Sequence, residues 1–380
     1  MKILNVVSVY FSIPFFFGDQ IGHFTAKGYD VHLICSPSDK IELFAEKQNA
    51  HYKEIPILRK ISIWNDLKAV FALYKYIREN KFDVVCGHTP KGALVAMLAS
   101  FLARTPKRVF FRHGLIYETT KGFKKSLLIN MERLTSFCST QVVCVSPYLM
   151  ERSIRDHLTT KDKMIVLHKG SCNGIDSSVK FNPKKYSVKD REDLKTSMGI
   201  SSNAYVIGYT GRLVHDKGIE ELVDAFVGLQ QRHGNSYLLL VGPMEEKDPL
   251  SERIKEIIQR NNHIIVTGLV EAEIEKYYSI MNVLVLATYR EGFGTCILEA
   301  SAMEVPVLTT SHTGSRDAII DNETGLYIEL SVDSIKNTLE KLINNTDLAF
   351  KLGKQGRNYV SQNFGQHLIW DEIESHIYCS

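Results

Sequence analysis

The chain of 380 residues lacks several signatures of specialised proteins. Its seven cysteines are an odd number without a Cys-x-x-Cys pair, which argues against a disulfide framework or a zinc site and favours reduced thiols. No Asp-x-Asp pair occurs, so one common arrangement for holding a divalent cation is missing. No apolar run approaches the ~18 to 20 residues of a membrane-spanning helix. These absences predict a globular protein that is soluble or peripheral to a membrane.

The N-terminal segment MKILNVVSVYFSIPFFFGDQ combines a lysine with a long apolar stretch, as a signal peptide does. Asn5, Ser8, Ser12 and Pro14 interrupt the stretch, however, and no small-x-small cleavage motif follows it. The segment from Lys2 to Val9 therefore predicts a first buried strand of the fold.

Charge is unevenly distributed along the chain. Residues 1–175 hold 25 Lys and Arg against 14 Asp and Glu, whereas residues 176–380 hold 21 against 29, within a formal net charge of +3. A basic half attracts an acidic substrate, nucleic acid or an anionic membrane surface, or it complements an acidic neighbouring domain. No nucleic-acid recognition motif is present, so we expect no nucleic-acid partner.

Apolar runs of strand length alternate with segments of helical periodicity, which predicts α/β domains with parallel sheets. In the first half the predicted strands are Ile3–Ser8, Val31–Cys35, Asp83–Cys86, Val109–Arg112, Gln141–Val145 and Met164–Leu167. In the second half they are Val206–Tyr209, Tyr237–Val241, His263–Val266, Val283–Ala287, Pro306–Thr309 and Gly325–Ile328. The polar stretch from Gly170 to Lys195 is the expected linker, and ligands of such sheets bind at the carboxyl ends of the strands.

A glycine-containing turn follows the apolar run that ends at Ala287. Gly292 and Gly294 allow the backbone to turn sharply and to approach a ligand, and the helix that we expect next directs its N–H groups and positive dipole end toward an anion such as phosphate. Glu291 and Glu299 are hydrogen-bond acceptors suited to sugar or ribose hydroxyls. The alternative is that both glutamates are solvated surface charges.

A second loop follows the strand Val206–Tyr209 and contains Arg212 and Lys217 before an expected helix Ile219–Leu229. The arginine supplies a planar fork of donors and the lysine a mobile point charge, a combination suited to a diphosphate. Taken alone, the two cations favour a solvated loop with surface charges. Because both loops lie in the same predicted domain, we interpret them together as one anion site.

These motifs resemble those of the GT-B glycosyltransferases, and within them the large retaining family of type 4 that includes bacterial lipopolysaccharide and capsule enzymes. The matching segments are Gly211-Arg212-Leu213 with Lys217-Gly218, Glu291 to Glu299, Tyr237 to Gly242, and Val266 to Gly268. The resemblance covers essentially the whole chain. It implies two Rossmann-like domains facing a central cleft, with a C-terminal helix that packs back on the first domain.

The resemblance also implies roles for residues of the second half. Arg212 and Lys217 correspond to a clamp on the donor diphosphate, Glu291 to a contact with the donor sugar, and Glu299 to the residue that holds the ribose. The other implied donor-binding positions are Gly211, Gly268, Leu269, Gly292, Phe293, Gly294 and Thr295. Together with His113, the residues Arg212, Lys217 and Glu291 form the implied catalytic set.

The first half contributes histidines directly after two predicted strands. His113 follows Val109–Arg112 and corresponds to a family histidine that binds the donor sugar, although a lone histidine is often structural. His88 and Lys91 resemble a motif in relatives that extend polyprenyl-diphosphate-linked oligosaccharides, where they would meet the acceptor. Gly18 resembles a glycine whose amide approaches the diphosphate, but Phe16 and Phe17 stand where the family often has a second glycine.

Aromatic and basic residues of the first half suggest a membrane-facing surface. Phe11, Phe15, Phe16 and Phe17 crowd one loop, and we expect Phe16 and Phe17 to contact the acceptor. Lys121 to Ile129 is basic and apolar, which is typical of an interface with anionic lipid, whereas core packing is the alternative for the phenylalanines. We therefore expect peripheral binding at the cytoplasmic face of the membrane.

The predicted domains are residues 1–175 for acceptor binding, residues 176–364 for donor binding and residues 365–380 for the returning helix. The resemblance implies transfer of a hexose or N-acetylhexosamine from a UDP-sugar to a polyprenyl-diphosphate-linked saccharide, with retention at the anomeric carbon. We expect no cofactor and no metal, because Arg212 and Lys217 supply the positive charge. The alternatives are an epimerase related to UDP-N-acetylglucosamine 2-epimerase and a non-catalytic sugar-nucleotide-binding protein.

Overall fold

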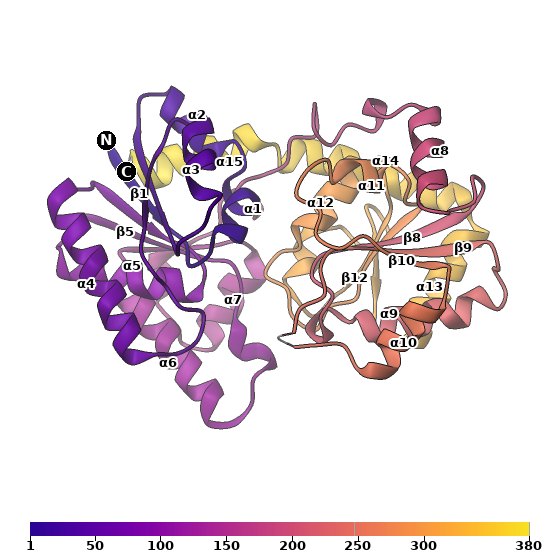
Figure 1. Cartoon of the computed structure of the whole chain (residues 1–380), viewed down its shortest axis with the longest axis horizontal. Helices are drawn as coiled ribbons and strands as arrows, with labels where there is room; N and C mark the ends of the chain where they lie inside the picture. The colour runs from indigo at the N-terminus through magenta and orange to yellow at the C-terminus, as the bar shows by residue number, and fades with distance from the viewer. Residues whose placement is uncertain (247, 380) are drawn as a thin grey trace. The chain divides into compact units, whose positions relative to one another are not determined.

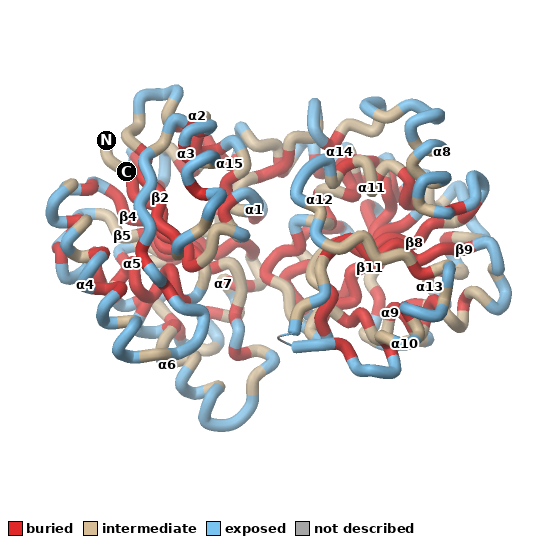
Figure 2. Tube along the Cα trace, viewed as in Figure 1, coloured by how far each residue is buried: buried red, intermediate tan, exposed pale blue. Residues whose placement is uncertain are grey.

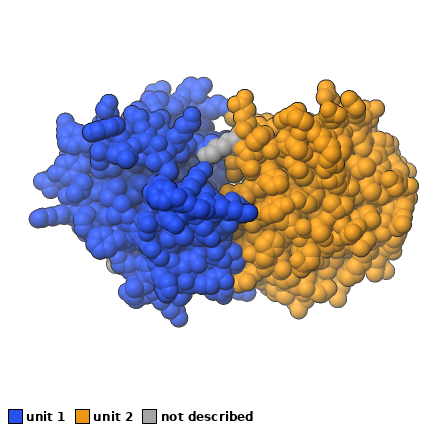
Figure 3. All heavy atoms as spheres, turned by 90° about the horizontal axis from the view of Figure 1, so that it is seen from below, with its two compact units in different colours: residues 1–174, 367–380 blue, residues 175–366 orange. Residues whose placement is uncertain are grey.

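The computed structural model describes residues 1–246 and 248–379, and the chain folds as two compact α/β units (Figures 1 and 3). The first unit comprises Met1–Gly174 and the C-terminal segment from His367 onward, and the second comprises Ile175–Gln366. The division lies one residue before the boundary expected from the sequence. Of the residues assigned to the returning helix, Ser380 lies outside the described range.

The sheet of the first unit has seven strands in the order β3-β2-β1-β4-β5-β6-β7, and all pairings are parallel. The strands are β1 (Lys2–Val6), β2 (Asp30–Cys35), β3 (His51–Glu54), β4 (Val84–Gly87), β5 (Lys107–Arg112), β6 (Gln141–Cys144) and β7 (Met164–Ile165). The sequence predicts all of them except β3. That edge strand, His-Tyr-Lys-Glu, is exposed along its length and has no apolar run to reveal it.

Helices cover both faces of this sheet (Figure 1). They are α1 (Ile13–Phe17), α2 (Gln20–Ala26), α3 (Ile41–Lys47), α4 (Ile63–Asn80), α5 (Pro90–Leu102), α6 (Gly122–Cys138), α7 (Pro147–Arg155) and α15 (Gln366–Ile373). Helix α5 packs between α4 and α6 on one face. On the other face, Ile369, Trp370 and Ile373 of α15 join the core formed by β1, α1 and α2, which confirms that the C-terminal helix packs on the first unit.

The sheet of the second unit has six parallel strands in the order β10-β9-β8-β11-β12-β13. These are β8 (Tyr205–Thr210), β9 (Ser236–Val241), β10 (Ile264–Val266), β11 (Val283–Leu286), β12 (Val307–Thr310) and β13 (Leu326–Ile328). The helices are α8 (Val188–Ser197), α9 (Ile219–Gln230), α10 (Glu252–Arg260), α11 (Glu275–Tyr278), α12 (Thr295–Ala302), α13 (Val332–Asn344) and α14 (Thr346–Asn363). The central strands are buried, as Figure 2 shows, which explains why continuous apolar runs predict all six.

The polar stretch expected as a linker is largely folded. Asp176 accepts backbone hydrogen bonds from Val179 and Lys180, and Ser187 begins α8 with a capping box completed by Asp190. The linker prediction is therefore wrong beyond Gly174, because its polar residues serve as caps and turns of the second unit. None of the described helices has the length and apolar character required to cross a membrane.

Candidate functional site

The strand order of the second sheet reverses at β8, since the chain first adds β9 and β10 on one side and later β11 to β13 on the other. Loops that leave adjacent strands in opposite directions open a crevice at such a point, where ligands of doubly wound sheets bind. The two loops singled out from the sequence follow β8 and β11, which are paired neighbours. The fold therefore brings both loops to one edge of the sheet.

Close backbone packing joins these two loops. Gly218 has a φ of +64°, and a Cβ atom there would lie 1.6 Å from the carbonyl oxygen of Ala287. The backbone N–H of Tyr289 and the hydroxyl of Thr288 both donate to the carbonyl of Asp216, at 3.1 and 3.2 Å. Only glycine fits at position 218, and its absence of a side chain allows Lys217 to approach the loop after β11.

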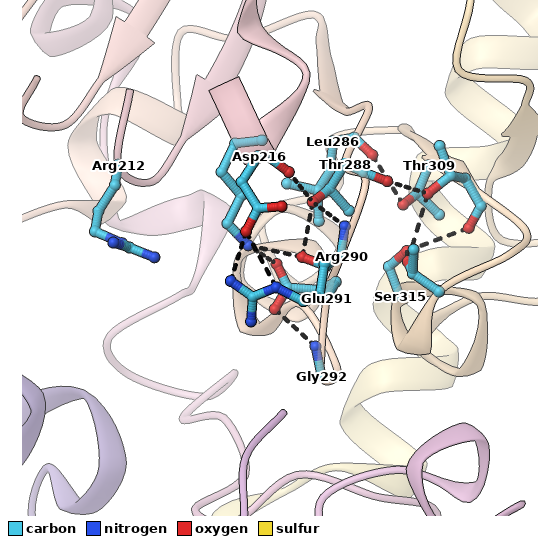
Figure 4. A network of polar contacts seen from close by, with 12 residues as sticks. Arg212, Asp216, Leu286, Thr288, Arg290, Glu291, Gly292, Thr309 and Ser315 are labelled. Carbon is cyan, nitrogen blue, oxygen red and sulfur yellow. Dashed lines mark hydrogen bonds and ion pairs between the residues drawn. The ribbon is translucent and has the colours of Figure 1, made fainter. Parts of the chain in front are cut away.

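Two ion pairs, Lys217–Glu291 and Arg290–Asp216, join the two loops, and Figure 4 shows Asp216, Arg290 and Glu291 in this polar network. Lys217 Nζ donates to Glu291 Oε2 at 2.6 Å and approaches the carbonyl of Arg290 at 3.3 Å. The guanidinium of Arg290 binds Asp216 Oδ2 through two nitrogens, Nε at 3.1 Å and Nη2 at 2.5 Å. The network places a lysine and an arginine beside a carboxylate at the carboxyl end of β11.

Glu291 is ionised at this site. Burial alone would raise the pKa of its carboxyl group, but the ammonium of Lys217 and the backbone N–H of Gly292, at 3.0 Å from Oε1, hold the pKa below its ordinary value. The side chain is 20% exposed. Glu291 is thus a charged acceptor fixed in orientation, as a residue that grips sugar hydroxyls must be.

Arg212 lies apart from this network in Figure 4. Its Nη1 donates instead to Glu245 Oε2 at 2.9 Å, and its side chain is 33% exposed. The hydroxyl of Tyr209 donates to the carbonyl of Arg212 at 2.9 Å, which fixes the backbone but leaves the guanidinium at the surface. Arg212 and Lys217, which are both expected to bind the donor diphosphate, therefore each form an ion pair with a different glutamate of the second unit.

The turn after Glu291 has its own support. A Cβ atom on Gly314 would lie 2.1 Å from the carbonyl oxygen of Gly292, so a second loop backs the turn closely, and Gly314 N–H donates to Glu291 O at 3.0 Å. Helix α12 begins at Thr295 with Gly294 in the left-handed conformation. Phe293 is 4% exposed and its ring packs against that of Phe364, so its contribution to a ligand is limited to the backbone.

Glu299 projects from α12 next to a residue that the sequence does not single out. Tyr278 donates its hydroxyl to Glu299 Oε2 at 2.6 Å. Burial raises the pKa of the Glu299 carboxyl, and the hydrogen bond from Tyr278 opposes this shift. The remaining implied donor positions lie on neighbouring loops: Gly211 follows β8, Gly268 forms a bridge with Gly242, and Leu269 is 46% exposed.

The two predicted histidines of the first unit contact one another. His113 follows β5, and its Nε2 lies 3.0 Å from His88 Nδ1. The other nitrogen of His88 lies 3.3 Å from Oδ1 of Asn5 on β1, and the ring of Phe16 stacks on His113 with centroids 3.8 Å apart. Burial lowers the pKa of His113 to about 3 and holds that of His88 well below its ordinary value, so both imidazoles are neutral.

Three residues implied for acceptor or phosphate contacts lie inside the first unit. His88 is 2% exposed and Phe17 is 1% exposed, so both belong to the interior rather than to an accessible acceptor surface. Lys91 is 6% exposed, and its ammonium forms a close ion pair with Asp66. These residues pack inward because they lie where α1 and α5 meet the sheet.

Gly18, the glycine implied to approach the diphosphate, lies at the end of α1. It has a φ of +49°, and its N–H donates to the carbonyl of Pro14 at 3.0 Å. A phosphate contact of this amide stays a prediction.

Sequence reasoning missed five residues of these sites: Asn5, Asp216, Glu245, Tyr278 and Arg290. Asp216 and Arg290 directly adjoin Lys217 and Glu291 in the sequence, so they could have been included in the predicted site. Asn5 could also have been noticed, because it is a polar residue inside the first apolar run. Glu245 and Tyr278 lie in separate segments, and only the tertiary structure brings them to Arg212 and Glu299.

Two doubly wound units with all-parallel sheets, and charged loops gathered at a strand-order reversal, define the GT-B class of fold. Residues 190–359 match the family described as "Glycosyl transferases group 1", and residues 18–176 match "Glycosyltransferase Family 4". The capsular polysaccharide biosynthesis glycosyltransferase CapM of Staphylococcus aureus is 34% identical over 98% of this chain and 96% of its own. The chain therefore belongs to the family 4 glycosyltransferases.

Other relatives are more distant. A UDP-Gal:alpha-D-GlcNAc-diphosphoundecaprenol alpha-1,3-galactosyltransferase of Escherichia coli is 25% identical over 88% of this chain and 85% of its own. The crystal structure of HepE from Anabaena, in complex with UDP and glucose, superposes with a TM-score of 0.83 over the full length of both chains at 19% identity. That structural similarity confirms the predicted fold.

Proposed function

We propose that this glycosyltransferase moves a hexose or N-acetylhexosamine from a UDP-sugar to a polyprenyl-diphosphate-linked saccharide, in the synthesis of a capsule or related surface polysaccharide, with retention at the anomeric carbon. The observation that carries the donor side is the pairing of Lys217 with Glu291 at the switch point of the second sheet. It sets a cation for the diphosphate next to an ionised acceptor for the sugar.

The relatives' names support the choice of substrates. The E. coli relative is named for a UDP-sugar donor and a diphosphoundecaprenol-linked acceptor, and the S. aureus relative for capsular polysaccharide biosynthesis. HepE was crystallised with UDP, with UDP and glucose, and with UDP-glucose. Glu299, hydrogen-bonded to Tyr278, is suited to the ribose hydroxyls, which are shared by all such donors.

Retention follows most simply from attack on the face that the diphosphate leaves. The acceptor oxygen bonds to the anomeric carbon as the bond from that carbon to the phosphate oxygen breaks, and the acceptor proton passes to the leaving diphosphate. Lys217 and Arg212 would stabilise the negative charge that develops there, a contribution worth about 10²- to 10³-fold in rate in comparable sites. The reaction then needs neither a side-chain base nor a metal.

The decisive experiment offers UDP-, GDP- and ADP-sugars with polyprenyl-diphosphate-linked acceptors, and analyses the products by mass spectrometry and anomeric NMR. We expect a new α-linkage from a UDP-α-sugar, formed equally well in EDTA. An inverted linkage would refute the mechanism, and activity lost in EDTA but restored by Mg²⁺ or Mn²⁺ would refute metal independence. Epimerisation of the donor without an acceptor, or nucleotide binding without turnover of any donor, would instead support the two alternative functions.

We further propose that the first unit binds an anionic membrane through its α4–α6 face. This face consists of exposed apolar residues on α4 and α6: Ile63, Trp64, Leu67, Phe71, Phe123, Leu127, Leu134 and Phe137, which are 36% to 84% exposed. Exposed lysines accompany them at positions 60, 68, 75, 121 and 124. Apolar side chains together with cations are the combination that binds at the interface of anionic lipid.

The proposed membrane-binding surface differs in part from the one expected from the sequence. The segment from Lys121 contributes Phe123 and Leu127, but Phe17 is in the core and Phe16 is stacked on His113. Sedimentation with vesicles tests the proposal, and we expect binding to anionic vesicles that weakens with salt and with the double substitution Trp64→Ala/Phe123→Ala. Phe350→Ala is the matched control, because Phe350 is 68% exposed on α14 of the other unit. Equal loss in the control, or no binding at all, would refute the surface.

A further inference from the structure

We propose that Asn5 and His88 form a hydrogen-bonded relay that fixes His113 as the Nε2–H tautomer. In this tautomer Nδ1 of His113 carries a lone pair and can accept a hydrogen bond from a hydroxyl group of the substrate. Both are positioning residues, because they act through His113. The inference rests on the proposed function in assigning His113 to the substrate. The tautomer itself is a property of the free protein.

Three polar side chains on or next to adjacent strands form a chain of two contacts. Asn5 lies on β1, His88 follows β4 and His113 follows β5, and these strands are consecutive neighbours in the sheet. Oδ1 of Asn5 is 3.3 Å from His88 Nε2, and His88 Nδ1 is 3.0 Å from His113 Nε2. Both separations lie within or close to ordinary hydrogen-bond distances.

The direction of donation follows from Asn5, the first of the three side chains. In the orientation that the structure gives Asn5, the amide oxygen faces His88 Nε2, and Nδ2 has no hydrogen-bond partner within the described residues. An amide oxygen can only accept, so in this orientation His88 carries its proton on Nε2 and donates it to Asn5. A neutral imidazole has one N–H group, which leaves His88 Nδ1 as an acceptor. His113 must then donate from Nε2, and its own Nδ1 becomes the acceptor.

Both imidazoles are neutral, so protonation does not change which nitrogen donates and which accepts. Burial is the main cause that lowers the pKa of each imidazole, and the proximity of His113 adds to the effect on His88. A neutral His113 is unsuited to donate a proton as an acid. Its Nδ1 has no hydrogen-bond partner within the described residues, and the residue is only half-buried, so this nitrogen is available to a ligand.

Aromatic rings hold the two imidazoles in place. His88 stacks on Phe111 with centroids 4.5 Å apart and meets the edge of Phe17 at 4.8 Å. Phe16 covers His113 at 3.8 Å with an interplanar angle of 5°. Phe16 and Phe17 lie at the end of α1, so they hold the two imidazoles between this helix and the sheet.

The backbone beside His88 is strained in a way that fixes its direction. Thr89 is a β-branched residue with a φ of +59°, a conformation that such residues rarely adopt. Its hydroxyl accepts the N–H of Gly92 at the start of α5 and also the N–H of Ser8. The strain is compensated by these bonds, and it turns the chain directly after His88.

Nitrogen NMR of the histidine-labelled protein tests the relay directly, because protonated and unprotonated ring nitrogens resonate far apart. We expect His88 and His113 to be neutral Nε2–H tautomers in the free protein. Asn5→Leu or His88→Phe should release His113 to a mixture of tautomers. Cys86→Ala is the matched control: Cys86 is a buried core residue that pairs in register with Asn5 but takes no part in the relay.

Kinetics test whether the relay serves the substrate. His88→Phe should lower kcat/KM for the donor about tenfold, as expected for one lost oriented hydrogen bond, without changing the affinity for UDP. His88→Gln, whose amide oxygen can replace Nδ1, should recover part of the loss. The Nδ1–H tautomer on His113, or the wild-type tautomer retained in Asn5→Leu, would overturn the relay. Absence of any donor turnover with the expected tautomer would instead refute the proposed function.

Discussion

Lys217 Nζ lies 2.6 Å from Glu291 Oε2, so the cation assigned to the donor diphosphate is already paired with the carboxylate assigned to the donor sugar. Each group keeps the other oriented before a ligand arrives. A diphosphate bound there, as proposed, would share the ammonium with Glu291.

Replacement of Lys217 by Met should therefore impair turnover more than binding. We expect kcat to fall by about 10²- to 10³-fold, because charge on the leaving diphosphate develops mainly in the transition state. UDP affinity, measured by calorimetry, should change far less. Lys255→Met is a suitable control, since Lys255 lies at the surface and forms its ion pair with Glu252, three residues earlier on the same helix. Equal effects on kcat and on UDP affinity would contradict the role.

We expect Glu291 and Glu299 to make the stability of the fold depend on pH in opposite directions. The folded-state pKa of Glu291 is depressed, so its contribution is present above the ordinary value of 4.5 and is lost as the pH falls through the folded-state pKa. The pKa of Glu299 is raised, so its contribution is complete below 4.5 and is lost as the pH rises.

Melting temperatures measured from about pH 3 to about pH 8 would separate the two residues. Glu291→Gln should destabilise the protein at neutral pH. It should also reduce the fall of the melting temperature toward low pH. Glu299→Gln should leave the melting temperature at neutral pH unchanged or raise it by a few degrees, while weakening nucleotide binding. A loss of stability at neutral pH in both variants would contradict this assignment of signs.

Gly218→Ala should disrupt the site through the backbone. The new Cβ atom would collide with the carbonyl of Ala287, so the loop that carries Lys217 must move away from Glu291. We expect activity to fall about 10²-fold, since displacements of ~1 Å have effects of this size. Gly234→Ala is the control, because no atom of the described residues lies within 4 Å of the position that its Cβ atom would take. Similar activities in the two variants would show that the loop is free to adjust.

Glu245 should compete with the donor for Arg212. The guanidinium is partly exposed and pairs with Glu245 at 2.9 Å, an interaction that binding of a diphosphate would have to replace. Glu245→Gln should therefore tighten UDP binding by about two- to fivefold, in keeping with the small energy of an exposed ion pair. Arg212→Ala should weaken binding and abolish the benefit of the first substitution. A tighter complex in the double variant would exclude Arg212 as the phosphate ligand.

Much of the fold could be predicted because buried parallel strands are apolar along their length. Twelve of the thirteen strands follow from such runs, and only β3, whose four residues are exposed, gives no signal. The donor loops could also be located, because glycines and charges follow directly after β8 and β11. Glu245 and Tyr278 could not, since their partners are distant in sequence.

The sequence by itself determined the class of fold, the family, and the two loops that carry Lys217 and Glu291, because strand periodicity and local turn chemistry are encoded within short segments. Only the tertiary structure decided which charged side chains pair and that Phe17 and His88 lie in the interior. It also brought Asn5, His88 and His113 into successive contact. Those relationships arise from strands and helices far apart in the chain. Their order in the sheet, rather than any local pattern, sets the distances between side chains.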